Sequence, residues 1–322
     1  MQAKVGTLKL DAGQHRLIVR PDGAPHEALM DLRAVALAPP GIKPAWPAVS
    51  PPLAVSHATT GDDVARNPVT VAKVILDKTL TNEAREAAVR ANPQFASELI
   101  AEMTRDLTPA APAEQERIPW VWRIAVACGR RDDTGQLRKL LAVALPRDDQ
   151  PLLDWQAVAL GGGAVAGTSE RGHWPAKRMS EVIADDSDLK ARWQRALDLA
   201  AAKADDEKVP TPTRYDALRM LGAEPWDKRG AQLTRYVAKG THAELQAGAV
   251  AAMGDVDAPE ATAALLAALP GLTPDNRNAA LDTLLRNDSR TRALRVAVDS
   301  GKVERAWLGD ARLSRLAELG KN

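Results

Sequence analysis

Apolar residues return at a nearly constant interval in the second half of the chain. The recurring positions are Leu218, Leu221 and Leu233, then Val250, Met253 and Leu265, then Leu281, Leu284 and Val296. Each set follows the previous one after 31 or 32 residues. Within a set, the first two positions share one helical face, and the third lies beyond a turn, on a second helix. A fixed period with two helices per repeat is typical of stacked helix pairs. The sequence therefore predicts a mainly α fold, an α-solenoid of antiparallel helix pairs over residues 69–322.

The same register extends upstream through pairs in which a glycine follows a buried-type residue. These pairs are Cys128-Gly129 and Leu160-Gly161, which match Leu221-Gly222 and Met253-Gly254. We expect the glycines to adopt the left-handed conformation that ends a helix. Cys128 occupies a repeat position, so we expect it to be a small buried apolar side chain.

One segment interrupts the array, residues 161–174, with the sequence GGGAVAGTSERGHW. It is too rich in glycine and too long for an ordinary turn between two helices. We expect either an enlarged repeat or a loop that projects from one face. A helix over about 175–184 and a longer helix over about 188–204 should follow.

Helix start signals accompany the repeats. A cap residue stands before proline in several of them, and two others have the spacing of a capping box. The expected cap residues are Thr81, Asn92, Thr211, Thr241, Asp257 and Thr273.

The first 38 residues have a different pattern, in which apolar residues alternate with polar ones. VGTLKL and HRLIVRP are separated by Asp11-Ala12-Gly13-Gln14, which favours a hairpin, and residues 32–37 resemble a third strand. About three short strands cannot form a core alone, so they either pack on the helices or end an incomplete β-sandwich. Residues 39–68 are rich in proline and are expected to form a semi-rigid linker.

Composition narrows the function. The net charge of +1 lacks the basic excess of a nucleic-acid-binding protein. No apolar run is long enough to span a membrane, so membrane insertion is not expected. A single cysteine excludes an internal disulfide, and no two histidines have the spacing of a helical metal pair. We therefore predict no metal and no cofactor.

The repeats resemble the short HEAT-like repeats of the phycobilisome-lyase type. They are also similar to planctomycete-type multidomain proteins in which a HEAT-repeat region adjoins a c-type cytochrome module. The segments that carry the resemblance are IPWVWRIAVACGRRDD (118–133), LLDWQAVALGGGAVAG (152–167) and residues 205–250. The resemblance implies a HEAT-like α-solenoid and an extracytoplasmic, periplasmic or secreted, location.

Residues 10–39 resemble the last strands of β-sandwich modules beside carbohydrate-active domains, such as those of fucosidase type. The earlier strands of such a sandwich are missing, so we expect the chain to be a piece of a longer polypeptide. No Cys-x-x-Cys-His haem-attachment motif is present. Haem function therefore does not carry over from the resemblance.

His173 and Trp174, at the end of the glycine-rich segment, are the most site-like pair. Histidine titrates near neutral pH and tryptophan offers a stacking face. The alternative is that Trp174 packs on the next helix while His173 is solvated or caps it.

Two further groups are candidate binding residues. Trp120 and Trp122 lie two residues apart and so face different ways, one toward the core and one toward solvent. The acidic run Asp205, Asp206 and Glu207 lies between helices, where we expect a solvated loop or a surface binding role.

These observations favour a non-enzymatic interaction scaffold that binds a protein partner or a neighbouring domain. The alternative is a carbohydrate-binding or carbohydrate-associated module of an extracytoplasmic polysaccharide-degrading or redox protein, with exposed tryptophans stacking on a glycan. A third hypothesis, a hydrolase or lyase that works through residues 161–174, has the weakest support because no nucleophile motif is present.

Overall fold

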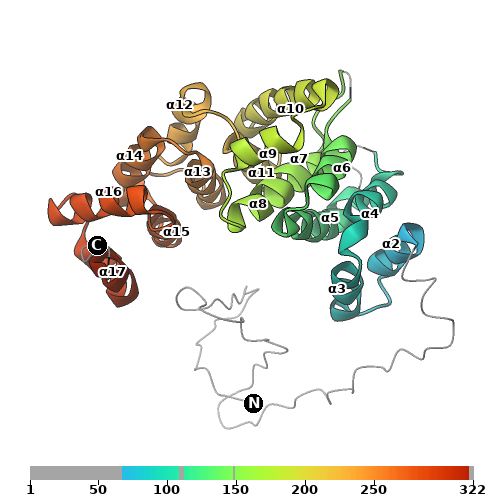
Figure 1. Cartoon of the computed structure of the whole chain (residues 1–322), viewed down its shortest axis with the longest axis horizontal. Helices are drawn as coiled ribbons and strands as arrows, with labels where there is room; N and C mark the ends of the chain where they lie inside the picture. Colours follow the sequence, from blue (N-terminus) through green and yellow to red (C-terminus); the bar gives the residue numbers. More distant parts are fainter. Residues whose placement is uncertain (1–66, 109–111, 148, 319–322) are drawn as a thin grey trace, which may run out of the picture. The chain divides into compact units, whose positions relative to one another are not determined.

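The computed structural model describes residues 67–108, 112–147 and 149–318, and this part of the chain is mainly α-helical, without a β-strand. The predicted strands of residues 1–38 and the linker 39–68, apart from its last two residues, lie outside the described residues. Figure 1 shows the helices following one another in chain order, from α2 in blue to α17 in red. None of the described helices is both long and apolar enough to cross a membrane.

The helices are α2 (Pro68–Leu76), α3 (Asn82–Ala91), η1 (Pro93–Phe95), α4 (Ala96–Thr104), α5 (Pro112–Arg131), α6 (Thr134–Ala144), α7 (Asp154–Ala157), η2 (Val158–Val165), α8 (Ala166–Glu170), α9 (Pro175–Val182), α10 (Ser187–Asp205), α11 (Thr211–Leu221), α12 (Trp226–Tyr236), α13 (Ala243–Asp255), α14 (Pro259–Ala268), η3 (Leu269–Gly271), α15 (Pro274–Leu284), α16 (Asp288–Asp299), η4 (Arg305–Trp307) and α17 (Gly309–Glu318).

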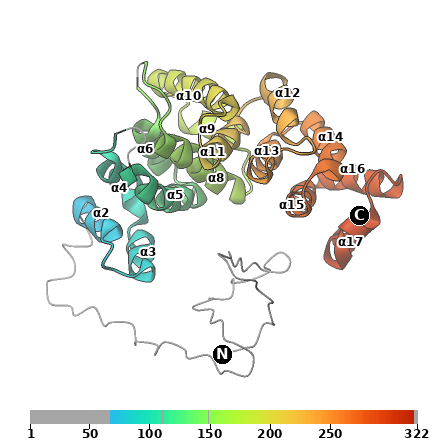
Figure 2. The same cartoon turned by 180° about the vertical axis from the view of Figure 1, so that it is seen from behind.

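Most of these helices fall into two rows. In row A, α5 packs on η2, η2 on α11, α11 on α13 and α13 on α15. In row B, α4 packs on α6, α6 on α9 and α10, α12 on α14 and α14 on α16. Toward the end of the array, each row A helix also contacts the row B helix that follows it in sequence, as α13 contacts α14 and α15 contacts α16. Figure 2 shows the same succession from behind.

The apolar repeat positions form the contact between successive helix pairs. Leu221, Met253 and Leu284 are fully buried near the ends of α11, α13 and α15, which pack on one another in that order. One repeat position is wrong. Val296 is 67% exposed on α16, and Leu294 is buried in its place. The physical reason is a shorter connection: α14 begins six residues after Met253, whereas α16 begins four residues after Leu284, so the place that corresponds to Leu265 falls at Leu294.

The expected caps are confirmed at Thr81 and Thr273, whose side chains accept from the backbone N–H three residues on. Asn92 is the N-cap residue of the 3-10 helix η1, with Pro93 at its first position as expected, but its side chain makes no cap bond and its amide donates to the Ala88 oxygen. The other three expectations are wrong, because the N-cap positions lie one residue away, at Pro210, His242 and Ala258, and of these only the His242 side chain accepts a hydrogen bond, from the Glu244 N–H.

None of the repeat glycines adopts the left-handed conformation, which corrects the expectation for Gly129, Gly161, Gly222 and Gly254; only Gly222 follows the last residue of a helix, α11, and its φ is -65°. None of them is among the positive-φ residues. A Cβ on Gly222 would lie 2.8 Å from the Ala252 oxygen of the next row A helix, and a Cβ on Gly254 would lie 2.9 Å from a Thr283 methyl. The 32-residue register of these glycines therefore marks where row A helices approach closely.

Left-handed residues end helices elsewhere. Gly172 and Gly301 follow α8 and α16 with φ of 85° and 73°. Asp132, a non-glycine residue with φ of 59°, follows the last residue of α5. Aspartate tolerates this conformation better than most residues because its short side chain forms local hydrogen bonds.

Candidate functional site

The glycine-rich segment is not a loop, which corrects the loop alternative for residues 161–174. Residues 154–170 form one helical run, with a π-helical stretch, η2, between α7 and α8. Every residue from Trp155 to Ser169 is buried. The enlarged-repeat alternative fits, because α9 and α10, both close to their expected ranges, follow before α11 resumes row A.

The glycines are required here by close packing. A Cβ on Gly161 would overlap the backbone oxygen of Asp216 on α11, and a Cβ on Gly163 would overlap the side chain of Ala125 on α5. Since neighbours press on both sides of η2, side chains on these glycines would force the helices apart. π-Helical stretches are rare and are frequent at functional sites. The middle of row A is therefore where functional side chains are most expected.

Asp216 lies beside this stretch. It is 9% exposed on α11, and a Cβ on Gly162 would overlap its Oδ1. Among the described residues it has no hydrogen-bond or ion-pair partner. Neither of its oxygens is among the enclosed polar atoms that lack a partner, so both keep some contact with solvent.

The charges around Asp216 are unbalanced. The pKa of its carboxyl is raised to about 7: burial is the largest cause, the Arg219 guanidinium opposes it, and the charge of Glu244 on α13 adds to it. Arg219 is bound to another acid, because its Nη2 donates to Asp255 Oδ2 over 3.0 Å. Asp216 therefore titrates near neutral pH, where its ionised form lacks a dedicated cation.

Trp122 stands next to Asp216. Its Cδ1 lies 3.2 Å from the position that a Cβ on Gly162 would take, so both side chains lean over that glycine. Trp122 is 40% exposed, whereas Trp120 is 5% exposed with the Arg85 guanidinium 4.2 Å from its ring centroid. The prediction that one of the two faces the core and the other faces solvent is confirmed. We call Trp122, Gly162 and Asp216 the Trp122–Asp216 site.

His173 and Trp174 occupy the turn between α8 and α9, away from this glycine. His173 Nε2 lies 2.9 Å from Asp132 Oδ2, and Arg178 Nε donates to Asp132 Oδ1 over 2.6 Å. The His173 side chain is half exposed. Trp174 is partly buried, precedes the first residue of α9 and has the Arg290 guanidinium 5.2 Å from its ring centroid. These contacts connect the turn to the end of α5 and to α16, so both residues have a structural role. A binding role for His173 stays a prediction.

The acidic run at the end of α10 is divided. Asp205 accepts from the Tyr236 hydroxyl over 2.8 Å and from Arg235 over 2.7 Å. Burial raises the pKa of Asp205, but these hydrogen bonds outweigh it and lower the pKa. Asp206 ends the helix and accepts from the Lys208 N–H, and Glu207 is exposed. The run does not contact the Trp122–Asp216 site, and its surface binding role stays a prediction.

A second buried carboxylate, Asp255, joins four helices. It is 1% exposed at the end of α13 and accepts from Arg219 of α11, from Arg286 just after α15, and from the Ser169 hydroxyl of α8. Arg286 also donates to the Ser169 backbone oxygen over 2.9 Å. Arg290 donates to the carbonyls that α13 leaves free, those of residues 253, 254 and 256. Both oxygens of Asp255 are paired, which makes this cluster structural.

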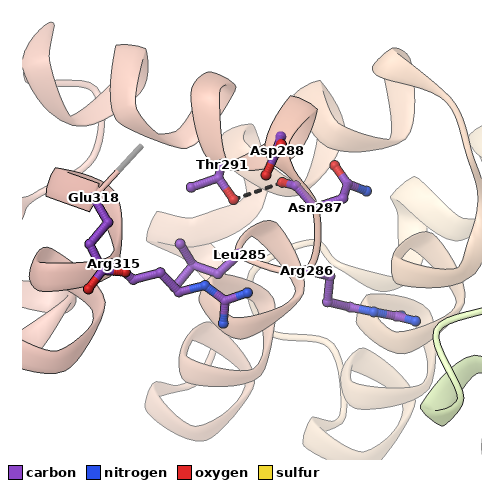
Figure 3. Close-up of a pocket in the computed structure, with 7 residues that line it drawn as sticks. All are labelled: Leu285, Arg286, Asn287, Asp288, Thr291, Arg315 and Glu318. Carbon is purple, nitrogen blue, oxygen red and sulfur yellow. Dashed lines mark hydrogen bonds between the residues drawn. The ribbon is translucent and has the colours of Figure 1, made fainter. Parts of the chain in front are cut away.

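A pocket of about 270 Å³ lies between the start of α16 and α17, as Figure 3 shows. It is lined by Leu285, Arg286, Asn287, Asp288, Thr291, Arg315 and Glu318. The Thr291 hydroxyl donates to the Asn287 oxygen within it (Figure 3). Two arginines and two acids line this pocket, so it has no charge preference for a ligand. No group of three or more His, Cys, Asp and Glu side chains in the described part of the chain is placed to hold a metal ion.

Asp216 and Glu244 were missed by the sequence analysis. A signal for Asp216 existed, because it lies three residues after Thr213 and four before Met220, both buried, which places an acid on the buried face of α11. Nothing in the local sequence connects it with Trp122, which lies in another repeat.

Comparisons with protein-family models, with curated proteins and with solved structures found no match.

Proposed function

We propose that the helical region is a HEAT-like α-solenoid that serves as a non-enzymatic interaction scaffold for a protein partner or a neighbouring domain. The observation that carries the proposal is the continuous succession of row A helices, in which each helix packs on the next. Such an array exposes one extended surface that crosses several repeats. Trp122, an exposed tryptophan beside a carboxylate without a partner among the described residues, offers a recognition element on that row.

Site-specific photo-crosslinking tests this function. A photoreactive amino acid replaces Ala247, Ala251 or Ala279 of row A in the full chain, which leaves Trp122 intact, and crosslinking is carried out in cells that naturally contain the protein. We expect the same partner polypeptide to be captured from several row A positions, because a scaffold partner spans consecutive repeats. Ala231 and Ala263 on α12 and α14 of row B serve as controls. Capture from no row A position, or equal capture from both rows, would refute the scaffold function.

A carbohydrate-associated module is the second candidate, favoured by the 40% exposure of Trp122, since an exposed indole stacks on sugar rings. It predicts that the full chain binds oligosaccharides on a glycan array and that Trp122→Ala removes this binding. An array without a hit would leave the scaffold as the sole candidate of the two. The extracytoplasmic location and a hydrolase or lyase reaction near residues 161–174 stay predictions.

A further inference from the structure

We propose that Trp122, Asp216 and Glu244 bind one cationic side chain, an arginine or a lysine, of a protein partner. The inference rests on the proposed scaffold function and names the chemistry that the scaffold recognises. The carboxylates of Asp216 and Glu244 supply negative charge, and the indole of Trp122 supplies an aromatic face that attracts cations.

The ionised carboxylate of Asp216 lacks a counter-ion among the described residues. A buried carboxylate is costly unless a cation or several hydrogen-bond donors compensate it. Asp216 is 9% exposed and has no such partner among the described residues. Arg219 is the nearby cation, but it is bound to Asp255. An incoming cation would supply the missing partner, and its charge would keep Asp216 ionised.

A second acid, Glu244, acts on Asp216. Glu244 lies in the first turn of α13, the helix that packs on α11, and its charge acts on Asp216 in the unfavourable direction. A cation bound at Asp216 would relieve this repulsion as well as compensate the buried charge. This arrangement selects a cationic ligand over a neutral one.

The indole of Trp122 supplies the aromatic face. Trp122 is exposed on the α5 side of Gly162, opposite α11. A guanidinium already stacks in this region, because Arg123 lies 5.0 Å from the Trp120 ring centroid and 5.8 Å from that of Trp122. Arg123 is paired with Glu86 over 3.1 Å, an acid that it shares with Arg90, and Arg123 is not among the charges that shift the pKa of Asp216. A sugar ring would use the indole but would not need two acids.

The test is a titration of the full chain with capped pentapeptides that differ only in the central residue: arginine, lysine, citrulline or norleucine. Binding is followed by the NMR shift of the Trp122 indole N–H. We expect saturable shifts with arginine and lysine, and none with citrulline, which keeps the shape of arginine but lacks its charge. Because Asp216 is mostly protonated at pH 6 and mostly ionised at pH 8, affinity should rise about tenfold between these values.

Variants separate the site from non-specific attraction. Asp216→Asn should weaken the arginine peptide about tenfold at pH 8 and abolish the pH dependence, and Trp122→Ala should weaken it as well, read by calorimetry. Glu260→Gln, which removes an exposed acid from the first turn of α14 in row B, is the matched control and should bind as the wild type does. Far-ultraviolet circular dichroism verifies that each variant is folded.

Three outcomes would overturn the inference: no shift with the arginine peptide, equal affinity for the citrulline peptide, or unchanged binding by Asp216→Asn. Binding of a neutral oligosaccharide that depends on Trp122 and not on Asp216 would assign the site to glycans and would also overturn it. The photo-crosslinking experiment does not depend on these peptides. A partner captured along row A together with failed titrations would therefore remove the cationic site and leave the scaffold intact.

Discussion

Single residues in this protein acquire their chemistry from neighbours in other repeats. Asp216 is the clearest case, because its ordinary pKa of 3.8 is raised to about 7 by burial against η2 and by the charge of Glu244, with Arg219 opposing. Cys128 is another, since burial raises the pKa of its thiol to about 12. That agrees with the expected role of Cys128 as a small buried side chain and not a nucleophile.

The raised pKa of Asp216 predicts how stability depends on pH. The folded state holds the proton of Asp216 up to about pH 7, whereas the unfolded state releases it near the ordinary value. The stabilisation from the protonated form is complete below the unfolded pKa and is lost as pH rises through the folded pKa. Asp216→Asn should therefore raise the free energy of unfolding at pH 8 by a few kcal/mol, since each tenfold difference in proton affinity corresponds to about 1.4 kcal/mol. At pH 5 the gain should be much smaller.

Urea unfolding of the wild type and the variant between pH 5 and pH 8 measures this difference. Asp205→Asn is the control, because hydrogen bonds lower the pKa of Asp205 and its titration falls below this pH range. That variant should change stability by the same amount at every pH tested. A difference between the wild type and Asp216→Asn that does not change with pH would contradict the raised pKa.

At the scale of elements, glycine position decides how closely two helices approach. The α7–η2–α8 run lies between α5 and α11. On both sides, the backbone of the run lies directly against backbone or side-chain atoms of the neighbouring helix. Gly167 is in this run, and a Cβ on it would lie 2.9 Å from the Cα of Gly129 on α5. The repeated glycines thus act as contact points between helices, where the sequence pattern had indicated helix ends.

Gly161→Ala tests this contact. The added Cβ would overlap the backbone oxygen of Asp216, so α11 must move, and we expect a loss of about 1–3 kcal/mol in the free energy of unfolding. Gly135→Ala is the matched control on α6. It is exposed, and its Cβ would meet no atom closer than 3.4 Å, so the substitution should stabilise by about 0.5–1 kcal/mol. Equal effects of the two substitutions on the urea midpoint would contradict close packing at Gly161.

At the scale of the described helical region, distant repeats are tied together by one buried ion cluster. Contacts in a simple helical repeat run only between neighbours. Here Arg286, just after α15, reaches Ser169 at the end of α8, although α11 and α13 lie between them in row A. Asp255 is the shared acid of that cluster. The central repeats should therefore unfold together.

Replacement of Asp255 by alanine should cost about 3–5 kcal/mol, because it leaves the buried guanidinium of Arg219 without its carboxylate. Asp282→Ala is the control. Asp282 pairs with Arg312 over 2.7 Å at the surface, where loss of an ion pair costs about 1 kcal/mol or less. Denaturant unfolding measures both. Similar losses in the two variants would show that the Asp255 cluster does not hold the central repeats together.

The mainly helical fold and the repeat register could be predicted from the amino-acid sequence. Helical periodicity reports which face of each helix is buried, so Leu221, Met253 and Leu284 could be assigned to equivalent places before any coordinates were known. It also predicted that one of Trp120 and Trp122 faces solvent. The error at Val296 arose because the connection from Leu284 to α16 is two residues shorter than the one from Met253 to α14, a change that a constant period does not anticipate.

The roles of the glycines and the acids depend on how the helices pack against one another in three dimensions. A glycine pattern is the same for a loop, a helix end or a close contact, and the choice depends on which helix lies against it, as α5 and α11 lie against η2. Likewise, Asp216 and Trp122 are 94 residues apart in sequence and meet only because both lean over Gly162. Long-range packing sets that neighbourhood, and with it the charge state of Asp216, and no local pattern encodes it.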